Sequence, residues 1–215
     1  MPTLYFSPGS AAMAPHAAFL EAGAPLEIVK IERENGVITS PANYKELNPH
    51  GRVPALVDGD LRLYESAAIV LHVADRYPQS GLLPASGSDA RSLATRWLVH
   101  LTNTVQPQFI AVFGAARMVG ADASPEVLDQ VKAGAQTVLA QQWDWLDSEL
   151  AGKQYLLGDT FSAADLYLFM LTRWGRILTP PSWDRPNIAA HYARLAARSS
   201  VAAMLEQQGI EAYPA

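Results

Sequence analysis

The first third of the chain alternates short apolar runs with turn signals, a pattern typical of a small α/β domain. The apolar run at residues 4–6 (LYF) predicts a short strand. Met13, Ala17 and Leu20 then recur at helical spacing, which predicts one apolar face of a helix. Gly23 follows as a signal that ends this helix. The chain therefore begins with a strand, a turn and a helix.

A second strand and a hairpin follow this first helix. Residues 26–31 (LEIVKI) form a nearly continuous apolar run rich in β-branched residues, which predicts a buried parallel strand. A polar stretch at residues 32–52 separates this run from two short strand candidates, residues 53–58 and 61–64. The Asp-Gly-Asp sequence near their junction is a strong hairpin signal, and residues 66–77 have helical periodicity. The predicted order is β-α-β, a β-hairpin and a final helix.

A change of composition divides the chain into two parts. Residues 79–88 are rich in Pro, Gly and Ser, which is typical of a linker. Beyond them no stretch has the pattern of a strand, and apolar residues recur at helical spacing. Pro107 interrupts or kinks the first of these helices. We therefore predict an α/β domain over residues 1–78, a linker, and an all-α domain over residues 89–215. The other expected helix starts are Pro125, Ser162, a position after Pro186, and Ser199.

The stretch Ser162-Ala-Ala-Asp165 has the spacing of a capping box, and Phe161 before it completes a hydrophobic staple with Leu166. We expect it to start a central helix of the second domain, so its role is structural.

Composition limits the classes of function. Hydrophobic residues make up 49% of the 215 positions and charged residues 17%, as in an ordered globular protein. The net charge is −5 and no Lys/Arg run is present, which argues against nucleic acid or an anionic membrane as a partner. No apolar run approaches the roughly 20 residues that span a bilayer. Without a basic and apolar leader at the N-terminus, we expect a cytoplasmic protein.

The sequence contains no cysteine, which excludes disulfides, a cysteine-based zinc site and a cysteine nucleophile. Its five histidines have no pairwise spacing of a metal ligand set on one helix, so we expect no metal. A Ser-His-Asp triad lacks support because the chain has no G-x-S-x-G elbow. The histidines are His16, His50, His72, His100 and His191.

Two backbone features are candidates for ligand binding. The turn after the first strand leads into a helix N-terminus, which favours a small anion or a thiolate, and Ser10 lies in this turn. Val53-Pro54 leads into a strand, where a proline removes a ladder hydrogen bond. This proline either starts the strand in the trans form or follows a cis peptide. In the cis form the N–H and C=O of Val53 are left to pair with an extended ligand.

Glu65-Ser66 stands at a strand-to-helix junction. Ser66 is a candidate N-cap, and the exposed amides at a helix start suit a ligand carboxylate. Glu65 beside them suits an ammonium group, so the pair matches an amino-acid group of a ligand. The alternative is an ordinary helix cap preceded by a surface glutamate.

Together these segments resemble the glutathione S-transferases of the bacterial beta class. The resemblance extends over nearly the whole chain, and it depends on the order and spacing of motifs that are individually weak. The motifs are LYFSPGSAAMAPHAAFLEAG (4–23), NPHGRVPALVDGDLRLYESAAIVLHVADRYP (48–78), RWL (96–98) and GDTFSAADLYLFMLTRW (158–174). The family implies a thioredoxin-like first domain, a helical second domain, a homodimer in the cytoplasm and a role in detoxification.

The resemblance also implies a glutathione site in the first domain. Val53, before a cis Pro54, is expected to pair with the cysteinyl main chain of glutathione. Glu65 and Ser66 are expected to hold its γ-glutamyl end. Arg52 is expected to meet the glycyl carboxylate in place of the family's basic residue near Asn35-Gly36, which this sequence lacks. Further expected glutathione contacts are Ala11, Asn103 and Thr104, the last two in the second domain.

The sequence departs from the family pattern near the sulfur of glutathione. The family's cysteine position is Ala11, and the neighbouring hydroxyl belongs to Ser10. The family's histidine and lysine correspond to Gln106 and Pro107, and its basic residue near Asn35-Gly36 is missing. Chemistry that needs a protein sulfur is therefore excluded.

The sulfur is then expected to come from glutathione itself. A free thiol has a pKa of about 8.5, and one donor plus a helix N-terminus lowers it by about two. We expect Ser10, or a backbone amide at Ala11 or Ala12, to donate to the thiolate. The thiolate then attacks a small, largely apolar electrophile held by Phe109, Phe113 and Trp174. For Ser10, the alternative is a helix N-cap.

Two other classes of function remain open. One is a non-catalytic protein of this family that binds glutathione or a protein partner, which the missing cysteine, histidine and lysine favour. The other is a specialised glutathione-dependent isomerase, dehalogenase or lyase. Retention on immobilised glutathione followed by a conjugation assay distinguishes them.

Overall fold

The structure is a computed structural model that describes residues 1–34 and 37–212. The chain forms two compact units. Of the described residues, the first unit contains 1–91 and 195–212, and the second contains 92–194. The C-terminal helix thus belongs to the first unit, whereas the sequence analysis placed residues 89–215 in one domain. That domain division stays a prediction.

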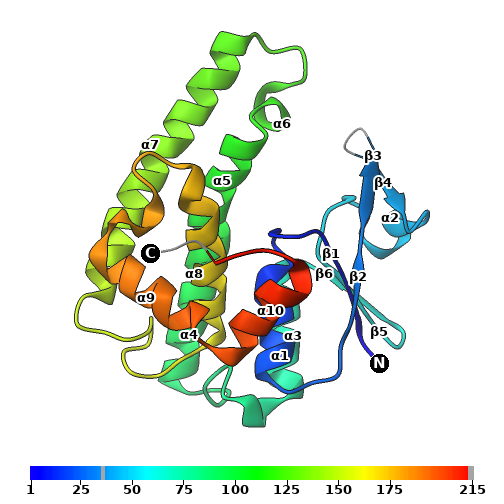
Figure 1. Cartoon of the computed structure of the whole chain (residues 1–215), viewed down its shortest axis with the longest axis vertical. Coiled ribbons are helices and arrows are strands. Elements are labelled where there is room, and N and C mark those ends of the chain that lie inside the picture. The colour runs from blue at the N-terminus through cyan, green and yellow to red at the C-terminus, as the bar shows by residue number, and fades with distance from the viewer. Residues whose placement is uncertain (35–36, 213–215) are drawn as a thin grey trace. The chain divides into compact units, whose positions relative to one another are not determined.

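A four-stranded sheet forms the centre of the first unit, with the strand order β2-β1-β5-β6 (Figure 1). Strand β2 is parallel to β1, whereas β5 runs antiparallel to both β1 and β6. This mixed sheet with helices is the thioredoxin-like arrangement expected from the sequence. The strands are β1 (Thr3–Phe6), β2 (Glu27–Lys30), β5 (Ala55–Asp58) and β6 (Leu61–Tyr64).

Strand β2 corrects one expectation. It is parallel to β1 as predicted, but it lies at the edge of the sheet and none of its four residues is buried. An edge strand has one neighbour instead of two, so its side chains lose less contact with water. The apolar run therefore indicated the strand correctly but not its burial. Only Ile31, directly after it, is buried.

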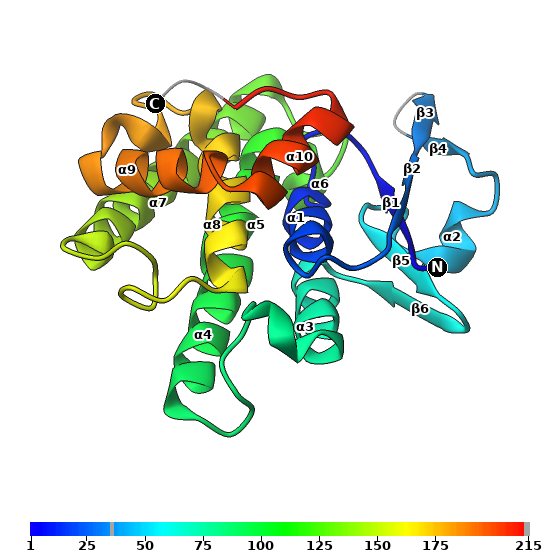
Figure 2. The ribbon, with the colours of Figure 1, turned by 60° about the horizontal axis from the view of Figure 1, so that its bottom comes forward.

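Three helices pack on one another in the first unit. Helix α1 contacts both α3 and α10, and Figure 2 shows α1 flanked by these two helices. An ion pair joins Arg198, just before α10, to Glu21 at the end of α1, and Ser200 donates to the same carboxylate. The bounds of these helices are Met13–Glu21 for α1, Ser66–Arg76 for α3 and Ser199–Gln208 for α10.

The polar stretch at residues 32–52, where the apolar pattern predicts no element, contains regular structure. It contains a two-stranded antiparallel ribbon and a short helix. The side chains of β3 are all exposed, so no apolar pattern marks this strand. Tyr44 of the short helix is buried and packs with Ile31 and Ala55. The elements are β3 (Glu32–Glu34), β4 (Val37–Ser40) and α2 (Tyr44–Leu47). Asn35 and Gly36, where the family has a basic residue, lie outside the described residues.

The second unit is helical, as expected, and its described residues contain no strand beyond two isolated bridges. The first long helix continues through a π-helical turn, Leu101–Val105, into the next one. Pro107 lacks an N–H and its ring crowds the carbonyl of Asn103, and a widened turn accommodates both effects. The helices are α4 (Asp89–His100, which begins in the first unit), α5 (Gln106–Phe113), α6 (Ala116–Val119), α7 (Pro125–Leu150), α8 (Ala163–Trp174) and α9 (Pro186–Ala196, which ends in the first unit).

Helix α8 is the core of the second unit, because every residue from Ala163 to Trp174 is buried. The predicted capping box is present at its start. The carboxylate of Asp165 accepts from the N–H of Ser162 at 2.8 Å and from the Ser162 hydroxyl at 3.1 Å. The structural role that the sequence indicated for this motif is confirmed.

We expect Ser162→Ala to lower the free energy of unfolding by about 1 kcal/mol. The substitution removes a buried hydroxyl that hydrogen-bonds Asp165. Urea denaturation measures the change. Ser148→Ala is the matched control, because Ser148 is exposed on α7, and it should change stability by less than about 0.5 kcal/mol. An equal effect of both substitutions would contradict the capping role.

Among the described residues, no helix is long and apolar enough to cross a lipid bilayer.

Candidate functional site

The sheet register brings three turns of the first unit together at one end of its strands. Each of these turns is called a corner below. Tyr5 of β1 pairs with Ala55 of β5, and Ala55 pairs with Tyr64 of β6. The segment just before Ala55 therefore lies between the end of β1 and the end of β6. These three segments are Ser7–Ala12, Val53–Pro54 and Glu65–Ser66, and they contain half of the candidate site residues named from the sequence.

The first corner is the turn between β1 and α1. The N–H of Ser10 donates to the carbonyl of Ser7 at 3.1 Å, and Gly9 between them has a φ of 70°, which favours glycine. The Ser10 Oγ accepts from the N–H of Ala12 at 3.3 Å. This is a local serine turn just before α1, which starts at Met13. The Ser10 hydroxyl already accepts one bond, and it can donate another at the same time.

The second donor in this turn is a backbone amide. In the part of the chain that the structure describes, the N–H of Ala11 has no hydrogen-bond partner, and the residue is half-buried. The carbonyl of Ala11 accepts from the hydroxyl of Ser66 at 2.8 Å. This bond ties the start of α1 to the start of α3. The turn can thus offer the Ser10 hydroxyl and the Ala11 N–H to a ligand.

The second corner is Val53–Pro54, whose peptide bond is cis, as one of the two interpretations of the sequence required. Within residues 1–34 and 37–212, neither the N–H nor the C=O of Val53 has a protein partner. The chain just before it is fixed, because the carbonyl of Arg52 accepts from Tyr44 Oη at 2.7 Å and from Asn48 Nδ2 at 2.8 Å. A fixed backbone with one unpaired donor and one unpaired acceptor is suited to pairing with an extended peptide.

The third corner is Glu65–Ser66. Glu65 has a φ of 72° and is the only non-glycine residue with positive φ among the described residues. Such a conformation costs of order 1–3 kcal/mol and is typical of ligand sites. The Glu65 side chain is exposed, whereas Ser66 is 4% exposed.

One expectation about Ser66 needs correction. Ser66 is the first residue of α3 and does not cap it with its side chain. Its hydroxyl donates across to Ala11 instead. The first N–H groups of α3 therefore keep their capacity to bind an anion.

Arg52 places a positive charge beside the second corner. Its guanidinium is exposed, and no acidic group among the described residues lies within ion-pair distance. The first unit thus offers a carboxylate at Glu65, helix amides at α3 and a cation at Arg52.

The remaining candidates lie in the second unit, in the widened turn and on α5 and α8. Asn103 is exposed, and its Oδ1 accepts from the Thr102 hydroxyl at 3.3 Å; Thr104 is half-buried. The side chain of Gln106 accepts a hydrogen bond from the hydroxyl of Tyr167.

Phe109, Phe113 and Trp174, which the sequence suggested as contacts for an electrophile, form one aromatic cluster. The ring centroids are 5.9 Å apart for Phe109 and Phe113, and 5.5 Å apart for Phe113 and Trp174. Phe113 is 49% exposed, whereas Trp174 is 6% exposed and Phe109 is fully buried. Within this unit Phe113 therefore offers the surface, and the other two rings support it.

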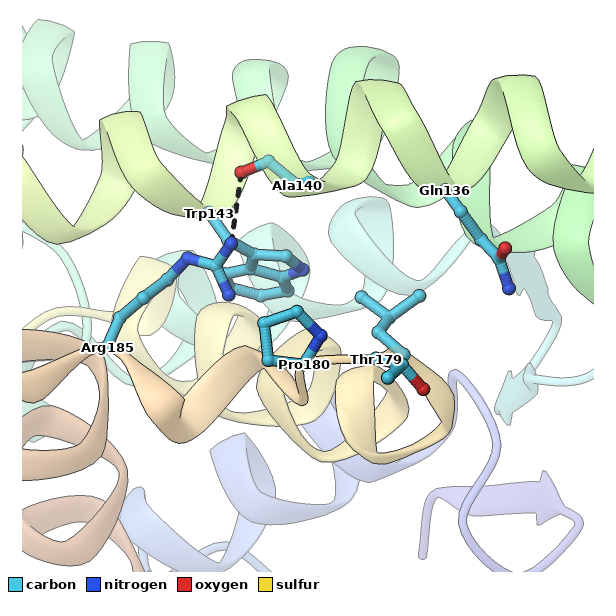
Figure 3. Close-up of a pocket in the computed structure, with 7 residues that line it drawn as sticks. Gln136, Ala140, Trp143, Thr179, Pro180 and Arg185 are labelled. Carbon is cyan, nitrogen blue, oxygen red and sulfur yellow. Dashed lines mark hydrogen bonds between the residues drawn. The ribbon is translucent and has the colours of Figure 1, made fainter.

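A small cavity of about 90 Å³ in the second unit was not anticipated (Figure 3). The buried Nε1 of Trp143, in its wall, has no hydrogen-bond partner among the described residues, and Arg185 donates to the carbonyl of Ala140 at 3.3 Å. None of the aromatic cluster lines this cavity. The lining residues are Gln136, Ala140, Trp143, Leu178, Thr179, Pro180 and Arg185.

The described residues contain no group of three or more acidic or histidine side chains placed to hold a metal ion.

Comparison with known proteins identifies two family domains. Residues 1–75 match the model of the glutathione S-transferase N-terminal domain, and residues 109–199 match that of the C-terminal domain. Glutathione S-transferase GST-4.5 of Xanthomonas campestris is 30% identical over 96% of this chain and 98% of its own length.

Comparison with solved structures leads to the same family. A sphingomonad glutathione S-transferase in complex with glutathione has a TM-score of 0.84 and 33% identity, covering 97% of this chain and 100% of that one. A beta-class glutathione S-transferase of Sphingomonas chungbukensis has a TM-score of 0.85 and 32% identity at the same coverage.

Proposed function

Because the chain belongs to the glutathione S-transferase family, we propose that it conjugates glutathione to small, largely apolar electrophiles. The observation that carries this proposal is the set of three corners at one end of the strands of the first unit. There a cis peptide leaves Val53 unpaired, Glu65 and the start of α3 stand on one side, and the Ser10–Ala11 turn stands on the other. Glutathione has a main chain, an amino-acid end and a thiol that match these three corners.

Each part of glutathione has a matching group. The N–H and C=O of Val53 pair with the cysteinyl main chain. Glu65 binds the γ-glutamyl ammonium, and the first amides of α3, at Ser66, bind the carboxylate beside it. The exposed guanidinium of Arg52 meets the glycyl carboxylate. In the second unit, Asn103 and Thr104 are further proposed contacts.

The thiol of glutathione is placed at the turn before α1. The Ser10 hydroxyl and the Ala11 N–H donate to the sulfur, and the partial positive charge of the α1 N-terminus adds to their effect. Lowering a thiol pKa of about 8.5 by two stabilises the thiolate by about 2.7 kcal/mol. The thiol proton leaves to solvent, and the thiolate sulfur donates its electron pair to form a bond to the electrophilic carbon. In chlorodinitrobenzene the carbon–chlorine bond then breaks and chloride leaves to solvent. Phe113, supported by Trp174 and Phe109, contacts the apolar part of that substrate.

We expect Ser10→Ala to lower kcat/KM for conjugation about fivefold at pH 6.5, because the loss of one donor raises the thiol pKa by about one and so reduces the thiolate fraction. The Ala11 amide remains, so activity should not vanish. Conjugation of chlorodinitrobenzene measures kcat/KM.

Ser7→Ala is the matched control in the same turn, because it leaves the carbonyl that accepts from Ser10 in place. It should change kcat/KM less than about twofold. An unchanged kcat/KM in Ser10→Ala would assign the whole effect to the Ala11 amide and leave Ser10 with its turn role only.

A second candidate function is glutathione binding without conjugation, either as a binding module or within a specialised isomerase, dehalogenase or lyase. It is supported by the absence of cysteine and by Gln106, a neutral side chain that Tyr167 already hydrogen-bonds. Retention on immobilised glutathione without turnover of chlorodinitrobenzene would favour it. Absence of retention would contradict every glutathione-dependent function.

The proposal includes a cytoplasmic homodimer that detoxifies electrophiles. Leu93 and Val99 of α4 are each 50% exposed, so this helix has exposed apolar side chains that could take part in pairing. Trp97 on the same helix is buried and donates to the carbonyl of Leu156, so its role is within the unit. Analytical ultracentrifugation measures the oligomeric state.

A further inference from the structure

A series of buried and partly buried hydrogen bonds connects the last turn of α10 to the turn before α1. The N–H of Gly9 donates to Gln208 Oε1 at 3.1 Å, and Gln208 Nε2 donates to His16 Nδ1 at 3.2 Å. His16 Nε2 in turn donates to Gln207 Oε1 at 2.9 Å. His16 is fully buried and Gln208 is 4% exposed. Residues almost 200 positions apart in the sequence therefore meet within the first unit.

These hydrogen bonds can all form together in only one protonation state of His16. Gln208 must turn its oxygen toward the Gly9 N–H, so its NH2 group faces His16 and needs an acceptor there. Only a neutral imidazole with its proton on Nε2 provides that acceptor at Nδ1. Burial lowers the pKa of His16, which favours the neutral form.

The Gly9 N–H, which donates to Gln208, directly precedes the two groups proposed to bind the thiol. Gly9 is followed by Ser10 and Ala11, and its φ of 70° makes it the corner of the turn. Helix α10 is itself fixed at its other end by the pair of Arg198 with Glu21. A side chain that fixes Gly9 from a secured helix therefore fixes the direction of the two donors that follow.

We propose that Gln208 is a positioning residue for the glutathione thiol, and that neutral His16 locks its amide in the productive orientation. This inference rests on the proposed glutathione site at Ser10 and Ala11. Gln208 does not touch the sulfur. It holds the turn so that both donors point at the position the sulfur occupies, and misplacing them raises the thiol pKa.

Protonation of His16 breaks this series of hydrogen bonds, because a proton on Nδ1 faces the Gln208 NH2 group. The folded protein binds this proton less readily than the unfolded chain. Its stability is therefore full above the ordinary histidine pKa of 6.5 and decreases as the pH falls through that value.

Other titratable groups lie on α1, α3, α10 and β1, the elements around His16. Each of them has a partner elsewhere or is exposed, and none of those described hydrogen-bonds His16. They are Glu21 on α1, Arg198 and Glu206 at α10, and His72, Asp75 and Arg76 on α3, with Tyr5 on β1.

Two substitutions of Gln208 separate positioning from packing. Gln208→Leu removes the acceptor of the Gly9 N–H. Gln208→Glu keeps an acceptor for Gly9 and provides a second one to a protonated His16. Thiolate absorbance of bound glutathione, followed through a pH titration, gives the thiol pKa. The affinity for S-methylglutathione reports the rest of the site, because this analogue has no thiol.

We expect Gln208→Leu to raise the pKa of the bound thiol by about one and to lower kcat/KM about fivefold at pH 6.5. Its affinity for S-methylglutathione should change less than about twofold. Gln208→Glu should keep the thiol pKa near that of the unsubstituted protein. Gln79→Leu, at an exposed glutamine of the same unit, is the control and should change nothing. A thiol pKa unchanged in Gln208→Leu would overturn the inference.

If Gln208→Leu does not fold, Gln208→Glu decides. The urea midpoint of the unsubstituted protein should fall between pH 7.5 and pH 5.5 by more than that of Gln208→Glu, whose carboxylate accepts from charged His16. If the urea midpoint fell equally in the two proteins, the proposed role of neutral His16 would be overturned. A protein that binds neither glutathione nor S-methylglutathione would instead contradict the proposed function.

Discussion

Replacing Asp165 with asparagine is expected to lower the free energy of unfolding by about 3–5 kcal/mol. The carboxylate is fully buried at the start of α8 and accepts from the N–H of Leu156 and from His191 Nε2, at 2.8 and 3.0 Å, besides its two bonds with Ser162. An amide has one oxygen, so its NH2 group must face at least one of these donors. Leaving buried donors unpaired is what makes the substitution costly.

Urea denaturation of Asp165→Asn measures this change. Asp129→Asn is the matched control, because Asp129 pairs with Lys132 at 3.1 Å on the exposed face of α7. Solvent screens that pair, so its loss should cost less than about 1 kcal/mol. The interpretation of Asp165 would be wrong if both substitutions had similar effects.

Replacing Glu65 with glutamine is expected to raise KM for glutathione about 10- to 100-fold, because a hydrogen bond to a charged group contributes about 1.5–3 kcal/mol. Glu65 is exposed and held with a φ of 72°, so no protein group requires its charge. The γ-glutamyl ammonium is remote from the sulfur. Its contact is equally strong in the ground state and the transition state, and kcat should change little.

Steady-state kinetics with varied glutathione separates KM from kcat. Glu46→Gln is the control, because Glu46 is an exposed glutamate of α2 in the same unit. It should leave both constants unchanged. A fall of kcat with constant KM in Glu65→Gln would place Glu65 near the reacting sulfur and contradict its role in binding the γ-glutamyl end.

Much of the fold was predictable, because its signals are local. Apolar periodicity and the capping box marked α8, and the Asp-Gly-Asp turn marked the β5–β6 hairpin. Strands β3 and β4 were missed because their side chains are mostly exposed and form no apolar stripe. The edge position of β2 was missed because a strand's neighbours are decided by the whole sheet.

The candidate site divides in the same way. Backbone signals within a few residues marked Val53, Glu65 and Ser66 as candidates, and the family resemblance proposed their roles, which stay predictions. The sequence also posed the alternatives for Ser10, and the structure shows that its oxygen accepts from Ala12. The family resemblance added Asn103 and Thr104, whose contacts with glutathione stay predictions.

The sequence by itself determined the family, the thioredoxin-like and helical architecture, and the absence of any protein thiol, because these follow from residue types and short spacings. Only the tertiary structure decided which groups meet. The bond from Ser66 to Ala11 and the series of hydrogen bonds from Gly9 through Gln208 to His16 join segments far apart in sequence. Their partners depend on how strands and helices pack, and short-range pattern does not encode that packing.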